Sequence, residues 1–197
     1  DARVAADERS GGEITKLFLS RAIDAARGPQ DIVVNEYSAL ADFMTFDEPG
    51  TWFLNPPAAG LGWGHPAAIG IKLAARDRAV ISVLGDGAYI FSNPAACHHA
   101  IDMHDLPLVT IVYNNARWEA VQGSARGMYG KDGALRKHKV APLSSLEPIP
   151  DFERYVEASN GIGLRVEHRE DLEPAIRRAL NIVRNDRKQV LINVIGS

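Results

Sequence analysis

Residues 79–87 read AVISVLGDG and contain the pattern that decides the fold. Five of the first six are apolar and three are β-branched, which predicts a short buried strand ending at Gly85. Residues 108–115 read LVTIVYNN and predict a second such strand, which ends at Asn114 and Asn115. The helix-length segment between them, residues 92–104, completes a strand–helix–strand unit. Such a unit predicts two parallel strands whose carboxyl ends lie at one edge of a sheet.

Oxygen-bearing side chains follow both strands. Asp86 comes after the first, and Asn114 and Asn115 come after the second. Ligands of open α/β sheets bind at this edge, and Mg²⁺ prefers oxygen ligands from protein and phosphate. Gly85 and Gly87 carry no Cβ, so they leave room for a bulky anion beside backbone N–H groups. Gly-Asp-Gly alone is also a common turn, and the paired asparagines favour the metal and phosphate interpretation.

The combination of Gly-Asp-Gly, residues 88–113 as spacer, and Asn-Asn resembles the thiamine diphosphate (ThDP) motif, whose spacer has a bounded length. Residues 59–70, AGLGWGHPAAIG, resemble the segment of that family that holds the aminopyrimidine ring. Residues from 150 onward resemble the closing part of the same domain. Over nearly its whole length the chain is similar to the C-terminal ThDP-binding domain of the acetolactate synthase and benzoylformate decarboxylase group.

The resemblance implies a set of site residues. Three of them would hold Mg²⁺: the Asp86 carboxylate, the Asn115 side chain and the backbone carbonyl of Arg117. Leu61 would wedge beneath the cofactor and keep it bent, while the N–H of Ala88 would bond a phosphate. The full cofactor-binding set implied is Ser38, Ala59, Gly60, Leu61, Gly85, Asp86, Gly87, Ala88, Asn115 and Arg117. For Ser38, a helix cap after the first strand is the alternative interpretation.

The resemblance also implies what the chain lacks. In this family the acid that acts on the pyrimidine ring is a Glu from another, homologous domain, and this sequence shows no candidate for it. The implied partners are therefore a pyrimidine-binding domain of the same or a partner subunit, a 2-oxo acid substrate and further copies in a homo-oligomer. The chain alone is expected to be inactive.

The implied activity is decarboxylation of a 2-oxo acid followed by carboligation, as in acetolactate synthase. Residues 118–121 depart from the pattern usual in acetolactate synthase, which leaves open a benzoylformate-type decarboxylase. A non-catalytic ThDP-binding module is a third interpretation. A fourth is an NAD-binding domain, because Gly62, Gly64 and Ala67 match a dinucleotide fingerprint. That fingerprint needs a strand running into its first glycine, and the prolines at 56–57 interrupt the strand.

Composition limits the classes of protein. The chain has 197 residues, 46% of them hydrophobic and 24% charged, with a net charge of −3. These values predict one globular domain, residues 13–197, after a tail or linker at 1–12. The absence of a basic stripe argues against a nucleic-acid partner, and no apolar run is long enough to span a membrane. Cys97 is the single cysteine, which favours a reducing, cytoplasmic compartment.

The remaining pattern predicts an α/β fold: a three-layer open parallel sheet of about five to six strands with helices on both faces. Residues 123–150 are predicted to be a long loop, serving as a lid, a partner contact or an irregular connection. His98, His99 and His104 are predicted to face solvent without binding zinc. Cys97 is interpreted as a small buried hydrophobe. Trp118 lines the pocket or covers the next helix, and the surroundings of His65 stay open.

Overall fold

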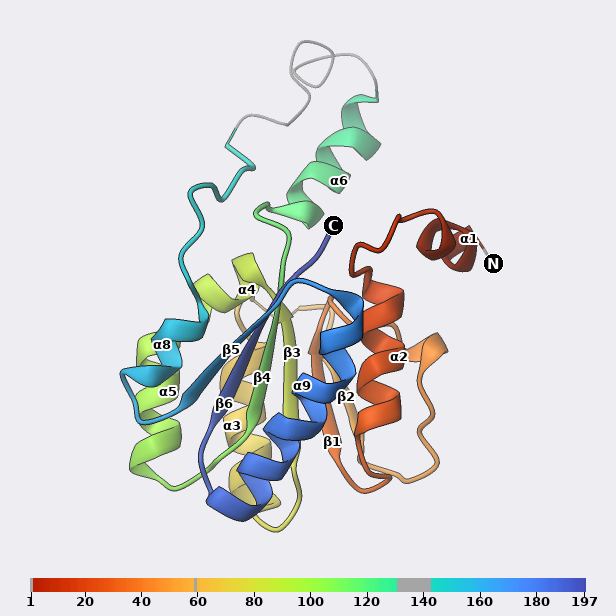
Figure 1. The fold of residues 1–197 in the computed structure, drawn as a ribbon. Coiled ribbons are helices and arrows are strands. Elements are labelled where there is room, and N and C mark those ends of the chain that lie inside the picture. The colour runs from red at the N-terminus through yellow and green to blue at the C-terminus, as the bar shows by residue number, and fades with distance from the viewer. Residues whose placement is uncertain (1, 59, 131–142) are drawn as a thin grey trace.

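The computed structural model describes residues 2–58, 60–130 and 143–197, and across these residues six strands form one parallel sheet (Figure 1). Each neighbouring pair is parallel. The order across the sheet is β2-β1-β3-β4-β6-β5. The strands are β1 (Ile32–Glu36), β2 (Trp52–Leu54), β3 (Val80–Gly85), β4 (Val109–Asn114), β5 (Ile162–Val166) and β6 (Val190–Ile195).

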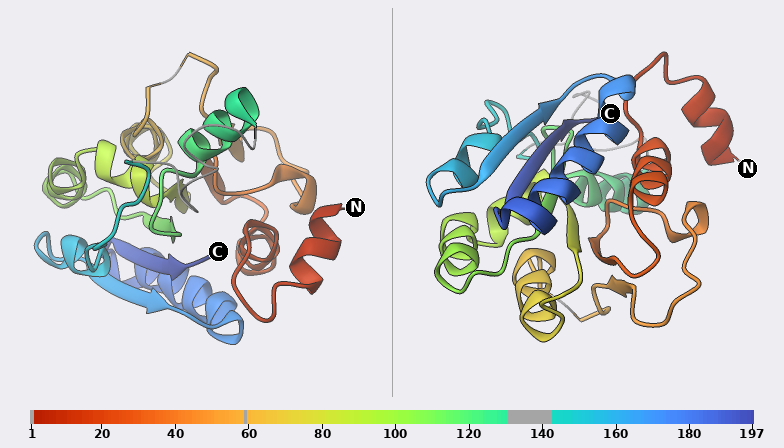
Figure 2. Two further views of the ribbon diagram at one scale, coloured as in Figure 1. Left: turned by 90° about the horizontal axis from the view of Figure 1, so that it is seen from above. Right: turned by 60° about the horizontal axis from the view of Figure 1, so that its bottom comes forward.

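Helices cover both faces of the sheet, so the prediction of a three-layer α/β fold is confirmed (Figures 1 and 2). On one face α2 packs against α9; on the other lie α3, α5 and α8, with the short α4 above them. The helices are α1 (Ala2–Glu8), α2 (Lys16–Ala26), α3 (Gly64–Ala74), α4 (Asp86–Phe91), α5 (Pro94–Met103), α6 (Glu119–Tyr129), α8 (Glu153–Glu157) and α9 (Arg169–Asn181). Two irregular turns, η1 (Ala41–Phe43) and η2 (Ile182–Asp186), complete the described elements.

Burial on both faces explains why the central strands are continuous apolar runs in the sequence. In β3, Ile81 packs toward α2 and α9, whereas Val80 packs toward α3 and α5. Alternate residues of a parallel strand point to opposite faces, and here both faces are covered, so nearly every position must be apolar. The apolar runs thus follow directly from the layered architecture.

The order of the strands also places the candidate site. The chain runs from β1 outward to β2 and then returns to β3 on the other side of β1. The ends of β1, β3 and β4, at Glu36, Gly85 and Asn114, therefore lie at one edge, the upper edge in Figure 1. A reversal of strand order at such an edge opens a crevice suited to a ligand.

Two segments differ in detail from the sequence-based expectations. Within the expected tail at 1–12, Ala2–Glu8 forms α1, and Asp7 accepts a hydrogen bond from Arg169 at 2.6 Å. The predicted loop at 123–150 was wrong over 123–129, because α6 continues to Tyr129. This helix contains two glycines, which lower its helix propensity, and Gln122 is its one buried described residue, so no buried apolar side chain marks it in the sequence. Residues 131–142 of that loop lie outside the described residues.

The prediction that His98 faces solvent was wrong. His98 is 1% exposed, and its ring nitrogens contact the Tyr89 hydroxyl and the Gln189 side-chain oxygen, each at 2.8 Å. His65, fully buried beside it, lies with its Nε2 3.3 Å from the Thr110 hydroxyl. The five side chains come from α3, α4, α5, β4 and the residue before β6, so periodicity on α5 alone could not reveal their polar partners. His99 and His104 are exposed, as predicted.

Cys97 is buried, as predicted, and burial raises the pKa of its thiol. Among the described residues, no helix is both long and apolar enough to cross a membrane.

We predict that the protein loses stability as the pH falls below about 6.5, the ordinary histidine pKa. Burial lowers the pKa of His65 well below that value, and the neighbouring His98 lowers it further. Burial also lowers the pKa of His98, partly opposed by its hydrogen bond to Gln189. The unfolded chain takes up these protons and the folded chain resists them. Each histidine therefore contributes a loss of up to about 1.4 kcal/mol per pH unit.

Urea unfolding between pH 7.5 and 5.5 measures this loss in free energy of unfolding. The variant His65→Leu should lose less stability over that interval than the wild type, whatever its absolute stability. His104→Gln changes an exposed histidine and should keep the wild-type pH dependence. An equal loss in the wild type and His65→Leu would show that His65 does not resist protonation.

Candidate functional site

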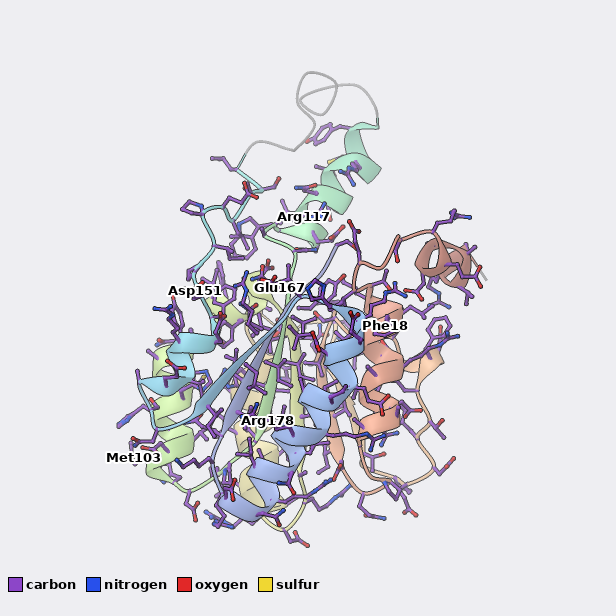
Figure 3. All side chains as sticks on the ribbon, in the orientation of Figure 1. Phe18, Met103, Arg117, Asp151, Glu167 and Arg178 are labelled. Atoms are coloured by element: carbon purple, nitrogen blue, oxygen red, sulfur yellow. The ribbon has the colours of Figure 1, made fainter. Side chains whose placement is uncertain are left out.

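A pocket of about 160 Å³ lies at the carboxyl edge of the sheet. Its walls come from the ends of β1, β3 and β4, the turn before α3 and the start of α6. Figure 3 shows Arg117 above the strand ends, where β4 leads into α6. Eight of the residues expected at a cofactor site line this pocket together: Ser38, Leu61, Gly85, Asp86, Gly87, Ala88, Asn115 and Arg117. Gly60 is exposed and does not line it, and Ala59 lies outside the described residues.

Asp86 forms the floor of the pocket and joins the tips of two strands. It is the first residue of α4, directly after β3, and is buried. Its Oδ1 accepts a hydrogen bond from the N–H of Gly87 at 2.7 Å, and its Oδ2 accepts one from the N–H of Asn115 at 3.1 Å. Burial raises the pKa of the Asp86 carboxyl, and hydrogen bonds from surrounding backbone N–H groups partly oppose this. The carboxylate is thus held in place at an electrostatic cost.

The two consecutive asparagines have different surroundings. Asn114 is buried, and its side chain bonds Asn193 at 3.1 Å and the N–H of Ala116 at 3.2 Å. Asn115 instead lines the pocket, and its side-chain nitrogen donates to Glu119 at 2.5 Å. Because the nitrogen is engaged, the amide oxygen is the Asn115 side-chain atom that can bind a cation. The structure thus separates a structural asparagine from one at the site.

Arg117 presents its backbone to the same region. Ala116 adopts a positive φ of 56°, which turns the chain sharply after β4. The segment is then tied to residues 144–146 by hydrogen bonds from Trp118 N to Ser144 O and from Leu146 N to Ala116 O, each 2.9 Å. The Arg117 carbonyl accepts the N–H of Glu119 at 3.0 Å, and a carbonyl has a second lone pair for a cation.

Ser38 and Trp118 complete the walls around the glycines. The Ser38 hydroxyl lies 3.6 Å from where a Cβ on Gly85 would stand, so it faces the start of α4. Ser38 caps no helix, since the next turn begins at Ala41. The Trp118 ring lies over Gly87, where a Cβ would come within 2.3 Å of it, and packs edge-on against Phe91. Of the two roles considered for Trp118, lining the pocket is the one observed.

Glu36 is a site residue that sequence reasoning missed. It ends β1, is 2% exposed and lines the pocket. Its carboxylate accepts hydrogen bonds from Gly62 N at 2.8 Å and Gly64 N at 2.7 Å. The available signal was an acidic residue directly after an apolar strand, but nothing in the sequence brings it to a glycine-rich turn 26 residues later.

The geometry also bears on the alternative ligands. β2 ends at Leu54, so no strand runs into Gly62, and the structural context of a dinucleotide fingerprint is missing. Among the residues that the structure describes, no three His, Cys, Asp or Glu side chains gather as a metal site. Asp86, Asn115 and Arg117 line the pocket, and their carboxylate, amide oxygen and backbone carbonyl are oxygen donors of the kind that suits a hard cation. The carboxylates of Glu36 and Glu119 line it as well.

Comparisons with known proteins agree with this arrangement. The 4-hydroxybenzoylformate decarboxylase of Rhodococcus jostii RHA1, a ThDP-dependent enzyme, superposes with a TM-score of 0.79 at 27% identity, over 95% of this chain and 33% of that one. The acetolactate synthase isozyme 3 large subunit of Escherichia coli (strain K12) is 31% identical over 74% of this chain and 24% of its own length. The sulfoacetaldehyde acetyltransferase of Castellaniella defragrans is 28% identical over 85% of this chain and 27% of its own length.

The chain spans about a quarter to a third of the length of these relatives. The model of the family described as "Thiamine pyrophosphate enzyme, C-terminal TPP binding domain", where TPP is another name for ThDP, matches residues 34–194. The match includes the ends of β1, β3 and β4 and every residue that lines the pocket except Lys16. The chain therefore belongs to the family of C-terminal TPP-binding domains of thiamine pyrophosphate enzymes.

Proposed function

We propose that residues 13–197 form one domain that binds ThDP through Mg²⁺, as part of an enzyme that decarboxylates a 2-oxo acid and joins the product to an acceptor. The observation that carries this proposal is the hydrogen bond between Asp86 Oδ2 and Asn115 N, 3.1 Å long, at the floor of the pocket. It joins the Asp86 carboxylate to the backbone of Asn115, whose side chain lines the same pocket. Acetolactate synthases are among the relatives.

The residues present fit Mg²⁺. Asp86, the Asn115 amide oxygen and the Arg117 carbonyl supply hard oxygen atoms, and phosphate oxygens with water would complete six positions. Burial without a counter-ion raises the pKa of Asp86. A divalent cation would offset that penalty, because a nearby positive charge favours the ionised carboxylate. A bound metal would therefore offset the free-energy cost of burying the Asp86 carboxylate.

The pocket also fits the two ends of the cofactor. Near Asp86, the diphosphate would meet the Ser38 hydroxyl and the N–H groups at the start of α4, including that of Ala88. Farther out, Leu61 is 46% exposed and lines the same pocket, where its side chain would support the bent cofactor. When bound, ThDP supplies a carbanion that breaks and forms bonds at the carbonyl carbon of a 2-oxo acid. The protein binds and orients the cofactor and limits access of water.

The acids of the pocket support the need for a second domain. Among the described pocket residues, Glu36 bonds the glycine turn, Glu119 bonds Asn115, and Asp86 is assigned to the cation. Each is committed to a structural or metal-binding contact. We therefore assign the acid that acts on the pyrimidine ring to a pyrimidine-binding domain, of the same or a partner subunit in a homo-oligomer.

A simple decarboxylase is the second candidate. The structural similarity to a 4-hydroxybenzoylformate decarboxylase covers 95% of this chain. The outer wall of the pocket, formed by Leu61, Trp118, Ala120 and Val121, is apolar enough to face an aromatic substrate. Release of carbon dioxide with or without a condensed product distinguishes the two reactions in the assembled enzyme.

We predict that the chain binds ThDP only in the presence of Mg²⁺ and that Asp86→Ala abolishes this binding. Isothermal titration calorimetry with ThDP, with Mg²⁺ and with EDTA, measures it. Removing a metal ligand should weaken binding at least about 100-fold, the upper range for loss of an outer-shell partner. Asp47→Ala removes an exposed acid outside the pocket and serves as the matched control. Equal ThDP affinity with Mg²⁺ and with EDTA would contradict the proposal.

We also predict that the chain alone does not turn over 2-oxo acids. With ThDP and Mg²⁺ it should release no more carbon dioxide from pyruvate or benzoylformate than the buffer does, because the acid for the pyrimidine ring is absent. Adding a pyrimidine-binding domain from the parent protein should restore release. Turnover by the chain alone would show that one of its own acids is sufficient.

A further inference from the structure

We propose that Glu36 is a positioning residue that locks the turn carrying Leu61 against the tip of β1 and so sets the outer half of the cofactor pocket. The effect on ThDP binding rests on the proposed function, whereas the hold of Glu36 on the turn does not. The starting observation is a carboxylate that is 2% exposed and accepts two backbone N–H groups, at 2.8 and 2.7 Å, from Gly62 and Gly64.

The helix that follows the turn needs such an acceptor. The first N–H groups of an α-helix have no partner within the helix and are usually capped by a side chain just before it. In α3 the residue at that position is Trp63, which forms no capping hydrogen bond. Glu36 reaches across from β1 and bonds Gly64, the first residue of α3. Its negative charge also lies at the positive end of the helix dipole.

The turn is shaped to meet this carboxylate. Gly62 has a φ of +89°, and a Cβ there would stand 2.6 Å from backbone atoms of Phe91 and Ser92. A Cβ on Gly64 would stand 3.0 Å from atoms of the Glu36 side chain. The turn is therefore confined between the end of α4 on one side and Glu36 on the other. Gly62 in particular permits this approach, because it carries no Cβ and adopts a positive φ.

Leu61 directly precedes the locked segment and is otherwise poorly held. It is 46% exposed, and a Cβ on the neighbouring Gly60 would meet nothing within 4 Å. Glycine-rich backbone without packed neighbours has many accessible conformations, and ordering it opposes ligand binding. The two bonds from Glu36 restrict those conformations before the cofactor arrives. Glu36 also lines the same pocket as Leu61, so the lock acts within the site.

Asp31 provides a matched control at the opposite end of the same strand. It is buried just before β1, accepts a hydrogen bond from the N–H of Gly28 at 2.7 Å, and pairs with Arg184 at 2.5 Å. Glu36 and Asp31 are thus both buried acids that bond a glycine N–H. Asp31 does not line the pocket. Asp31→Asn should lower the stability of the fold, because it weakens these contacts, but should leave the turn before α3 in place.

The test compares Glu36→Gln, Glu36→Asp and Asp31→Asn in the 197-residue chain. Hydrogen–deuterium exchange reports the Gly62 and Gly64 amides directly, and calorimetry reports ThDP affinity in Mg²⁺. Glutamine keeps one acceptor but places an NH₂ against the second N–H, and aspartate keeps the charge on a shorter arm. We expect exchange at Gly62 and Gly64 to rise, and ThDP affinity to fall, by about tenfold or more in both Glu36 variants, since hydrogen bonds to charged groups are the stronger ones.

Asp31→Asn should leave the exchange of both glycine amides and the ThDP affinity within about twofold of the wild type, because distant sites act independently. Unchanged exchange at Gly62 and Gly64 in the two Glu36 variants would overturn the inference. So would faster exchange with unchanged ThDP affinity, which would mean that the lock does not serve binding. If the wild type itself fails to bind ThDP, the proposed function fails, and the exchange data still decide whether Glu36 holds the turn.

Discussion

The structure depends on a buried carboxylate that connects two strand tips. Asp86 extends from the end of β3 and accepts the N–H of Asn115, at the end of β4. This contact holds the first turn of α4 and the start of the segment toward α6 at fixed positions. A buried charge is unfavourable by itself, and burial raises the pKa of Asp86 accordingly. Hydrogen bonds from the N–H groups of Gly87 and Asn115 partly offset that cost.

The same device occurs at the neighbouring strand. Glu36 ends β1 and accepts two N–H groups from the turn before α3, as Asp86 accepts two N–H groups around the end of β3. In both cases the carboxylate of an acid at a strand end bonds backbone N–H groups of a loop, which form no hydrogen bonds within the sheet. Parallel strands deliver such tips to one edge, which is why the site lies there. We propose different roles for the two acids: Asp86 would bind a metal, whereas Glu36 accepts two N–H groups and holds the turn.

The pocket at this edge is polar at its floor and apolar at its outer wall. Its floor provides oxygen ligands and backbone donors, and its outer wall is apolar and partly exposed at Leu61. None of its described acids is without a structural or metal-binding assignment. We propose that such a surface holds the diphosphate and the face of the cofactor ring, and that the group for proton transfer at that ring comes from another domain. The geometry of this domain is thus consistent with its place as one part of larger ThDP enzymes.

The sequence by itself determined the parallel sheet and the motif at its edge. Largely apolar runs such as residues 79–84 follow from burial on both faces, and the residues directly after each strand must lie at the same edge. It also allowed the family to be recognised from Asp86 and Asn115. It could not place Glu36 against Gly62, nor bury His98 beside Tyr89 and Gln189, nor show that 123–129 are helical.

These features depend on side chains and segments that meet only after the layers have packed. Periodicity indicates which face of an element is buried, but not which polar side chain from another element will bond to that face. The tertiary structure alone decided those partners, because each is brought by a different element, and a hydrogen bond between distant segments leaves no local pattern in the chain.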